Sequence, residues 1–141
     1  MDILGIGTDI VECPRIGKMI EQHGELFLRR VYTPREIRYC QARKHAIEHF
    51  AGRWAAKEAI LKAMGTGWSQ GITWTDIEVR PGEGGRPQVM VCGMAREVAR
   101  ERGIGEILIS ISHCRTYATA YAMALARKAP LPAPAQPPAK A

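Results

Sequence analysis

The sequence predicts a single α+β domain in which helices pack against a mostly antiparallel sheet. A chain of 141 residues has the length of one ordinary domain. Its patterns run in the order strand, several helices, two strands, a helix and two further strands, which is typical of α+β folds. The last stretch is rich in Ala and Pro and has no apolar periodicity. We therefore assign residues 1–128 to the domain and residues 129–141 to a disordered tail.

Residues 3–11, ILGIGTDIV, are expected to form a first strand that is buried on both faces. The segment is rich in β-branched and apolar residues and is interrupted by glycines. By the alternation of a strand, Asp9 points to the same side as Gly5 and Gly7. Two positions without side chains beside a carboxylate leave room for another group to approach.

Three helical segments are expected to follow this strand. Residues 14–24 have a proline at a plausible first helical position and a glycine as their stop. Residues 25–32 continue as a short helix. Residues 33–44 begin with Thr33 as N-cap and Pro34 at the first helical position.

A longer helix is expected over residues 46–64, ended by Gly65 and Gly67. Its alanines recur every four positions, and such a stripe allows another backbone to pack closely. Glu58 and Lys62 lie between this stripe and apolar residues on their other side. The stripe consists of Ala51, Ala55, Ala59 and Ala63.

The second half of the domain is expected to supply four strands and one helix. Residues 73–81 alternate with period two, and residues 82–91 read as a turn and a second strand, so the two form a hairpin. Residues 93–103 have the spacing of a short amphipathic helix. Residues 106–113 and 116–126 are two further strands around a tight turn.

Asp9 and Glu58 are candidate ligands of one metal ion. If the first strand packs on the alanine stripe, the two carboxylates meet, and like charges at short range need a proton or a cation between them. Two carboxylates with open positions suit Mg²⁺, which takes further ligands from water and phosphate oxygens. Lys62 would then neutralise a phosphate or assist proton transfer. The alternative is a solvent-exposed Glu58–Lys62 pair of little consequence.

The net charge of +6 is concentrated in one part of the chain. Residues 13–62 hold eleven Lys and Arg against five Asp and Glu, and the rest of the chain holds nine of each. This excess suits a nucleic acid, a phosphate-rich ligand or an acidic protein, and the alternative is a solvated basic face. The basic half has no aromatic stacking platform and no recognisable recognition helix, so a nucleic acid partner is not expected.

The chain is expected to be a cytoplasmic protein without a membrane span. It has no apolar run long enough to cross a bilayer and no basic-then-apolar segment at its start. Its cysteines lack the spacing of a zinc site, so they are expected to be reduced thiols. They are Cys13, Cys40, Cys92 and Cys114.

Five segments in this order make the sequence familiar: GIGTDIVE at 5–12, FAGRWAAKEAILKAMGTG at 50–67, DIEV at 76–79, GRP at 85–87 and SISH at 110–113. Together they closely resemble the holo-[acyl-carrier-protein] synthase family, the small group of 4′-phosphopantetheinyl transferases. The resemblance covers nearly everything but the tail.

This resemblance implies a fold, an activity and an assembly. Members transfer 4′-phosphopantetheine from coenzyme A to a serine of an apo acyl carrier protein, release adenosine 3′,5′-bisphosphate and require Mg²⁺. They share the phosphopantetheinyl transferase fold and are typically homotrimers with active sites in clefts between subunits. The acidic carrier protein would account for the basic half of this chain. The general base stays open between an activated water and a nearby carboxylate.

The resemblance also assigns roles to individual residues. The family's metal ligands match Asp9 and Glu58, and its catalytic lysine matches Lys62. Its contacts to coenzyme A match Lys44, Arg53, Gly65, Gly67, Arg86, Pro87 and His113. Its carrier-docking helix matches Arg15, Lys18 and Met19. Cys114 departs from the hydroxyl or acidic residue that relatives often carry after the histidine, which leaves any role there open.

Three other functions remain open. A binding module for an acidic protein would not need Asp9 or Glu58. A nucleic-acid-binding protein would bind any DNA with a steep dependence on salt. A Mg²⁺-dependent phosphohydrolase would transfer the phosphoryl group to water instead of to a protein serine.

Overall fold

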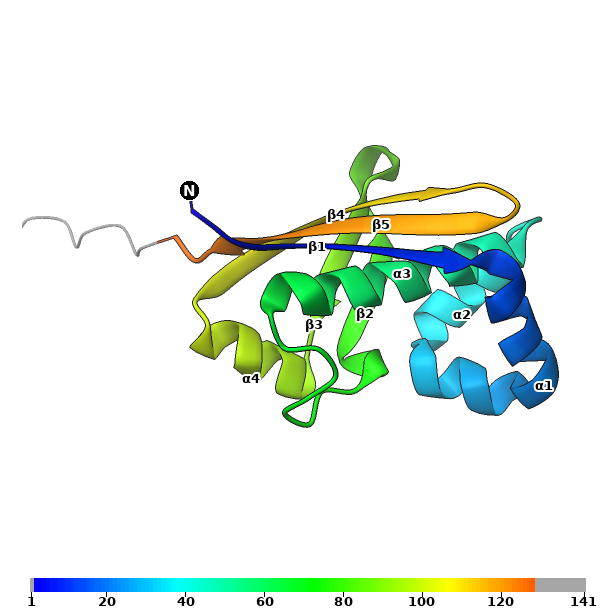
Figure 1. The fold of residues 1–141 in the computed structure, drawn as a ribbon, viewed down its shortest axis with the longest axis horizontal. Coiled ribbons are helices and arrows are strands. Elements are labelled where there is room, and N and C mark those ends of the chain that lie inside the picture. Colours follow the sequence, from blue (N-terminus) through cyan, green and yellow to red (C-terminus); the bar gives the residue numbers. More distant parts are fainter. Residues whose placement is uncertain (1, 129–141) are drawn as a thin grey trace, which may run out of the picture.

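A long helix, α3, lies at the centre of the fold with a three-stranded sheet along one side (Figure 1). The computed structural model describes residues 2–128, and the predicted tail, residues 129–141, lies outside the described residues. The strands are β1 (Ile3–Glu12), β2 (Ile77–Pro81), β3 (Pro87–Val91), β4 (Ile104–His113) and β5 (Tyr117–Ala126). The helices are α1 (Cys13–Val31), α2 (Pro34–Gln41), α3 (Ala46–Met64) and α4 (Gly93–Glu101). The predicted α+β class is confirmed.

The strands form two antiparallel sheets instead of one. The larger sheet has the order β1-β5-β4, and β2 pairs with β3 in a separate hairpin. The central strand, β5, presents a row of buried alanines on every second position, against which α3 packs. Small side chains on both elements bring the helix and the sheet close together.

The predicted contact between the first strand and the alanine stripe is confirmed. A Cβ atom at Gly5 would overlap the carbonyl oxygen of Ala63, and one at Gly7 would overlap that of Ala59. The alanines of the stripe are at most 5% exposed. Glycine on the strand and alanine on the helix therefore let the two backbones touch, which carries Asp9 to the side of α3.

The expectation that this strand is buried on both faces is wrong. Ile6 is 72% exposed and Ile10 is 63% exposed, whereas Gly7 and Val11 on the opposite face are buried. Residues 2–128 supply no element that covers this outer face of the sheet. Leu108 and Tyr121 of the neighbouring strands add to the same exposed apolar surface.

Local signals set the helix ends, with small differences from the expected bounds. Gly24 has a φ of 52° and separates the two helical segments of α1. Thr33 and Glu36 form a reciprocal capping box at the start of α2, which ends at Gln41 instead of residue 44. Gly65 ends α3 in the left-handed conformation, with a φ of 77°. No helix within residues 2–128 has both the length and the apolar character needed to span a membrane.

The strand expected over residues 73–81 begins only at Ile77. Trp74–Asp76 form a turn of 3₁₀-helix. The Asp76 carboxylate causes this, because it accepts hydrogen bonds from the Thr73 backbone N–H at 3.2 Å and from the Thr73 hydroxyl at 3.0 Å. Such local bonds compete with strand pairing.

A buried ion pair between Lys57 and Glu36 connects the helices to the hairpin. Lys57 Nζ lies 2.8 Å from Glu36 Oε1 and also donates to the carbonyl oxygens of Val31 at 2.7 Å and Trp74 at 3.0 Å. Glu36 in turn accepts the Val79 backbone N–H at 2.9 Å. Burial lowers the pKa of the Lys57 ammonium, and the facing carboxylate opposes that shift.

Lys57→Met is expected to lower the free energy of unfolding by about 3–5 kcal/mol, because it leaves the Glu36 carboxylate buried without its cation. Urea denaturation measures the change. Lys62→Met is the matched control; its side chain is 53% exposed, so we expect a loss of about 1 kcal/mol or less. A Lys57→Met protein as stable as its parent would contradict a stabilising role for the pair.

Candidate functional site

Asp9 and Lys62 meet where β1 crosses α3. Lys62 Nζ lies 3.2 Å from Asp9 Oδ1 and donates to the Thr8 carbonyl oxygen at 2.9 Å. Glu58 lies on α3 one turn before Lys62, on the same side of the helix. Asp9 and Lys62, which are 53 positions apart in the sequence, thus form one polar cluster beside the contact between β1 and α3.

Glu58 is held by an aromatic cluster. Trp68 donates its indole N–H to Glu58 Oε1 at 3.1 Å. The Trp68 ring lies 3.9 Å from that of Trp74, centroid to centroid, and Trp74 lies 4.3 Å from Trp54. The carboxylate is therefore oriented from the loop that follows α3 as well as from α3 itself.

Asp9 and Glu58 carry carboxylate oxygens, which are donors of the kind that Mg²⁺ prefers. No group of three or more His, Cys, Asp and Glu side chains within residues 2–128 could hold a metal ion. A cation near Asp9 and Glu58 would therefore take two carboxylates from the protein and its other ligands from water and a bound phosphate. Mg²⁺ is usually bound in this way, through one or two carboxylates and substrate phosphates.

A second polar cluster lies near the start of α3. His113 Nδ1 lies 3.0 Å from Glu48 Oε2, and the His113 ring is 5.0 Å from that of His49. The guanidinium of Arg53 lies 4.1 Å above the Tyr39 ring. Arg53 is only 6% exposed, and its Nε is a buried donor without a hydrogen-bond partner among residues 2–128.

Arg53 and Arg43 give this cluster positive charge, and Glu48 gives it a negative one. Burial lowers the pKa of His49, electrostatic interactions with His113, Arg53 and Arg43 lower it further, and Glu48 opposes the shift. Lys44 is exposed two residues before the helix begins. His49 thus lies between Arg53 on α3 and His113 on β4, and Lys44 precedes the start of the same helix.

The other predicted coenzyme A contacts lie elsewhere in the protomer. Gly65 and Gly67 follow the opposite end of α3, with φ angles of 77° and 57°. A helix of 19 residues is about 28 Å long. Lys44 and Gly67 are therefore too far apart to contact the same phosphate within one protomer.

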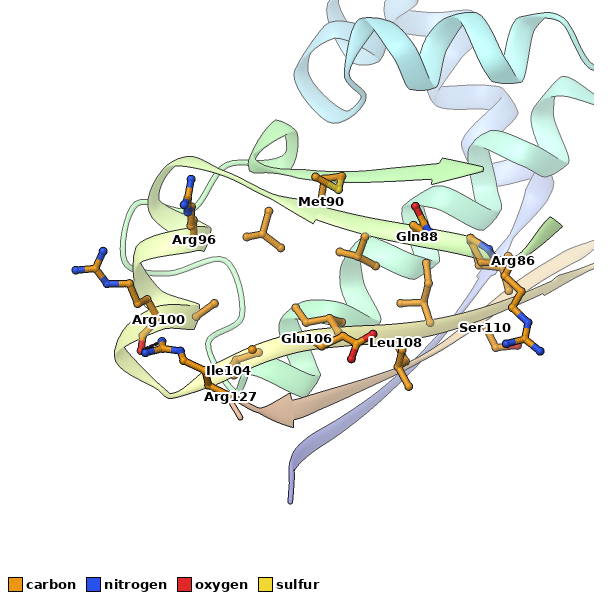
Figure 2. Close-up of a pocket in the computed structure, with 18 of the residues that line it drawn as sticks. Arg86, Gln88, Met90, Arg96, Arg100, Ile104, Glu106, Leu108, Ser110 and Arg127 are labelled. Atoms are coloured by element: carbon orange, nitrogen blue, oxygen red, sulfur yellow. Dashed lines mark hydrogen bonds between the residues drawn. The ribbon is translucent and has the colours of Figure 1, made fainter. Parts of the chain in front are cut away.

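Arg86 and Pro87 lie at the turn of the β2–β3 hairpin and line a groove of about 1090 Å³. The groove runs between β3, β4 and α4, with valine and isoleucine side chains along it. Arg86 and Ser110 lie at one end, and Arg96 and Arg100 lie at the other (Figure 2).

The predicted carrier-docking residues lie on α1. Arg15 and Lys18 are exposed and line a groove of about 860 Å³ together with Glu21 and Tyr117. Met19 is half-buried and packs against the core. The two basic side chains are thus accessible to a partner, and Met19 is only partly so.

Sequence reasoning missed Trp68, His49 and the buried partners Lys57 and Glu36. The only signal for Trp68 was the presence of three tryptophans within residues 54–74. No local sequence pattern indicates that the indole of Trp68, ten residues after Glu58, donates a hydrogen bond to the Glu58 carboxylate.

A family profile, curated sequences and solved structures all match this chain to the same family of proteins. The profile of the 4′-phosphopantetheinyl transferase superfamily matches residues 5–126. A holo-[acyl-carrier-protein] synthase of Koribacter versatilis is 52% identical over 118 residues, which are 84% of this chain and 94% of the relative. The crystal structure of the Neisseria meningitidis enzyme of that name has a TM-score of 0.81 at 31% identity, over 88% of this chain and 99% of the other. The Helicobacter pylori synthase in complex with coenzyme A has a TM-score of 0.75 at 29% identity, over 85% and 99%. The chain therefore belongs to the 4′-phosphopantetheinyl transferase superfamily.

Proposed function

We propose that this protein transfers the 4′-phosphopantetheine group of coenzyme A to a serine of an apo acyl carrier protein. The observation that carries the proposal is the Asp9–Lys62 contact one turn from Glu58, built on the seam between β1 and α3. Relatives that cover most of this chain are named holo-[acyl-carrier-protein] synthase, and one of them was solved with coenzyme A. The products are the holo carrier protein and adenosine 3′,5′-bisphosphate.

Asp9 and Glu58 would hold Mg²⁺, and Lys62 would lie beside the reacting phosphate. When bound, the ion withdraws charge from the diphosphate oxygens and makes the phosphorus a better electrophile. Lys62 holds Asp9 in place and presents an ammonium that is 53% exposed. A positive charge at this place compensates the negative charge that builds up on the leaving phosphate.

The carrier protein supplies the nucleophile, so this chain needs none. The serine Oγ forms a bond to the phosphorus next to pantetheine while the bond from that phosphorus to the bridging oxygen breaks. The bridging oxygen leaves on the adenosine bisphosphate, and the serine proton passes to a base. An activated water or a nearby carboxylate fills that last role.

The test is a direct assay of the carrier protein. The purified chain is incubated with coenzyme A, Mg²⁺ and an apo acyl carrier protein, and the carrier is weighed by mass spectrometry. A gain of one phosphopantetheine per carrier, lost when a chelator removes Mg²⁺, is the expected result. No gain with any of several carriers would overturn the proposal. Hydrolysis of coenzyme A without a gain would indicate a phosphohydrolase, and carrier binding without either would indicate a binding module.

The basic part of the chain suits an acidic carrier, and Arg15 and Lys18 are its accessible charges on α1. Charge complementarity of this kind raises the association rate more than the affinity. We also propose a cytoplasmic location, which agrees with four free thiols, of which Cys13 and Cys40 are buried.

A homotrimer with sites between subunits would resolve two features of the protomer. One is the separation of Lys44 from Gly67, which a neighbouring subunit can bridge. The other is the exposed outer face of the large sheet, where Ile6, Ile10 and Tyr121 are 72%, 63% and 63% exposed. Apolar surfaces of this kind mark interfaces between proteins.

Ile6→Glu is therefore expected to give monomers that transfer phosphopantetheine much more slowly, because it puts a charge on the exposed apolar face of the proposed interface. Sedimentation velocity measures the assembly. Leu26→Glu is the matched control: Leu26 is 82% exposed on α1, so this variant should stay trimeric. A parent protein that is monomeric and fully active would contradict the trimer.

A further inference from the structure

Trp68 is the hydrogen-bond partner that residues 2–128 provide for the Glu58 carboxylate. Its indole N–H donates to Oε1 at 3.1 Å. An indole nitrogen is a donor only, so it can bind a carboxylate but cannot itself be a ligand of a cation. A carboxylate rotates broadly about its terminal torsion, and a donor on one oxygen restricts that rotation. The second oxygen, Oε2, then points in a defined direction.

The position of Trp68 is itself determined by contacts outside the proposed metal site. Its ring lies 3.9 Å from the Trp74 ring, and Trp74 lies 4.3 Å from Trp54 on α3. The carbonyl oxygen of Trp74 accepts a hydrogen bond from the buried ammonium of Lys57 at 3.0 Å. Lys57 is the neighbour of Glu58 on α3. One end of this cluster is thus fixed in the core, and the other end holds the carboxylate.

We propose that Trp68 is a positioning residue that orients Glu58 toward the divalent cation. The inference rests on the proposed function, because it assigns Oε2 to the ion that Asp9 and Glu58 would share. It adds that the loop of residues 65–73, which carries Trp68, is coupled to cation affinity. Groups that hydrogen-bond a metal ligand commonly change metal affinity by about 10–100-fold when they are removed.

Trp68→Phe tests this role, because it keeps an aromatic ring next to Trp74 and removes the N–H. Calorimetric titration of Mg²⁺ into the protein with coenzyme A present gives the Kd. We expect that Kd to rise about 10-fold or more. The Mg²⁺ concentration for half-maximal transfer should rise in parallel, whereas kcat at saturating Mg²⁺ should fall much less. If the ring had a purely structural role, the substitution would not weaken Mg²⁺ binding while leaving kcat at saturating Mg²⁺ nearly unchanged.

The matched control is Trp74→Phe, which keeps a ring in the same cluster and removes an indole N–H that does not contact Glu58. Its Kd for Mg²⁺ should equal that of the parent. If Trp68→Phe does not fold, the isosteric replacement of Trp68 by benzothienylalanine keeps the bicyclic ring and removes only the N–H. Circular dichroism verifies the fold of each variant.

The outcomes separate this inference from the proposed function. A parent that modifies the carrier, together with a folded Trp68 variant whose Kd for Mg²⁺ is unchanged, would overturn the positioning role and leave the function standing. A parent that binds Mg²⁺ but modifies no carrier would overturn the function, and the titration of the Trp68 variant would still report on the hydrogen bond. A raised Kd for Trp68→Phe with an unchanged Kd for Trp74→Phe supports the inference.

Discussion

Glu58→Gln is expected to lower kcat for phosphopantetheine transfer by about 10³-fold while the fold stays intact. Loss of a metal that polarises a phosphoryl oxygen costs several kcal/mol of transition-state stabilisation, and each ~1.4 kcal/mol is a factor of ten in rate. Gln has nearly the same shape as Glu, and its amide oxygen can still accept the Trp68 N–H. The substitution therefore removes the charge and little else.

Mass spectrometry of the carrier over time gives the rate, and calorimetric titration of Mg²⁺ shows whether the cation still binds. Glu97→Gln is the matched control, since Glu97 is an exposed residue of α4 and undergoes the same chemical change. It should keep the parental rate. Full activity of Glu58→Gln would show that this carboxylate is not a metal ligand.

Gly7→Ala is expected to destabilise the protein by about 3 kcal/mol or more. The added methyl group would overlap the carbonyl oxygen of Ala59, and a backbone atom cannot move aside as a side chain can. The strand and α3 must separate, so Asp9 moves away from Lys62. We expect the transfer rate to fall together with the stability.

Urea denaturation measures the loss, and Gly17→Ala serves as the control. Gly17 lies inside α1, and a Cβ atom there would meet the Ile47 side chain at an ordinary distance of 3.5 Å. Ala favours a helix over Gly by about 0.5–1 kcal/mol, so this variant should be more stable than the parent. A Gly7→Ala protein with parental stability would mean that β1 and α3 do not touch as described.

The order of elements and most of their ends could be predicted because their signals are local. Thr33, Pro34 and Glu36 form a cap within four residues, and Gly24 interrupts a helix by its own backbone conformation. The alanine spacing and Gly65 predict the long helix over residues 46–64, and α3 has these same bounds. The alternation pattern places the start of this strand at residue 73, four residues before the true start of β2. Alternation does not indicate the local hydrogen bonds that the Asp76 carboxylate forms with Thr73.

Within the candidate site, the proximity of Asp9 to α3 could be predicted and its surroundings could not. Glycines on one element and alanines on another specify a close approach, whichever residues lie nearby. The distances among the predicted coenzyme A contacts depend on how the whole chain folds. Only the structure shows that Arg53 and His113 lie beside the first half of α3 and that Gly65 and Gly67 follow its last residue.

The sequence by itself determined the kinds of elements, their order and the one seam along which two backbones touch, because caps, breaks and small-residue spacing act over a few neighbours. Only the tertiary structure decided that Lys57 is buried against Glu36 and that Trp68 returns to Glu58. On a helix, Lys57 has the periodicity of an ordinary basic residue. Whether such a side chain meets water or a carboxylate depends on segments that pack against it from elsewhere in the chain.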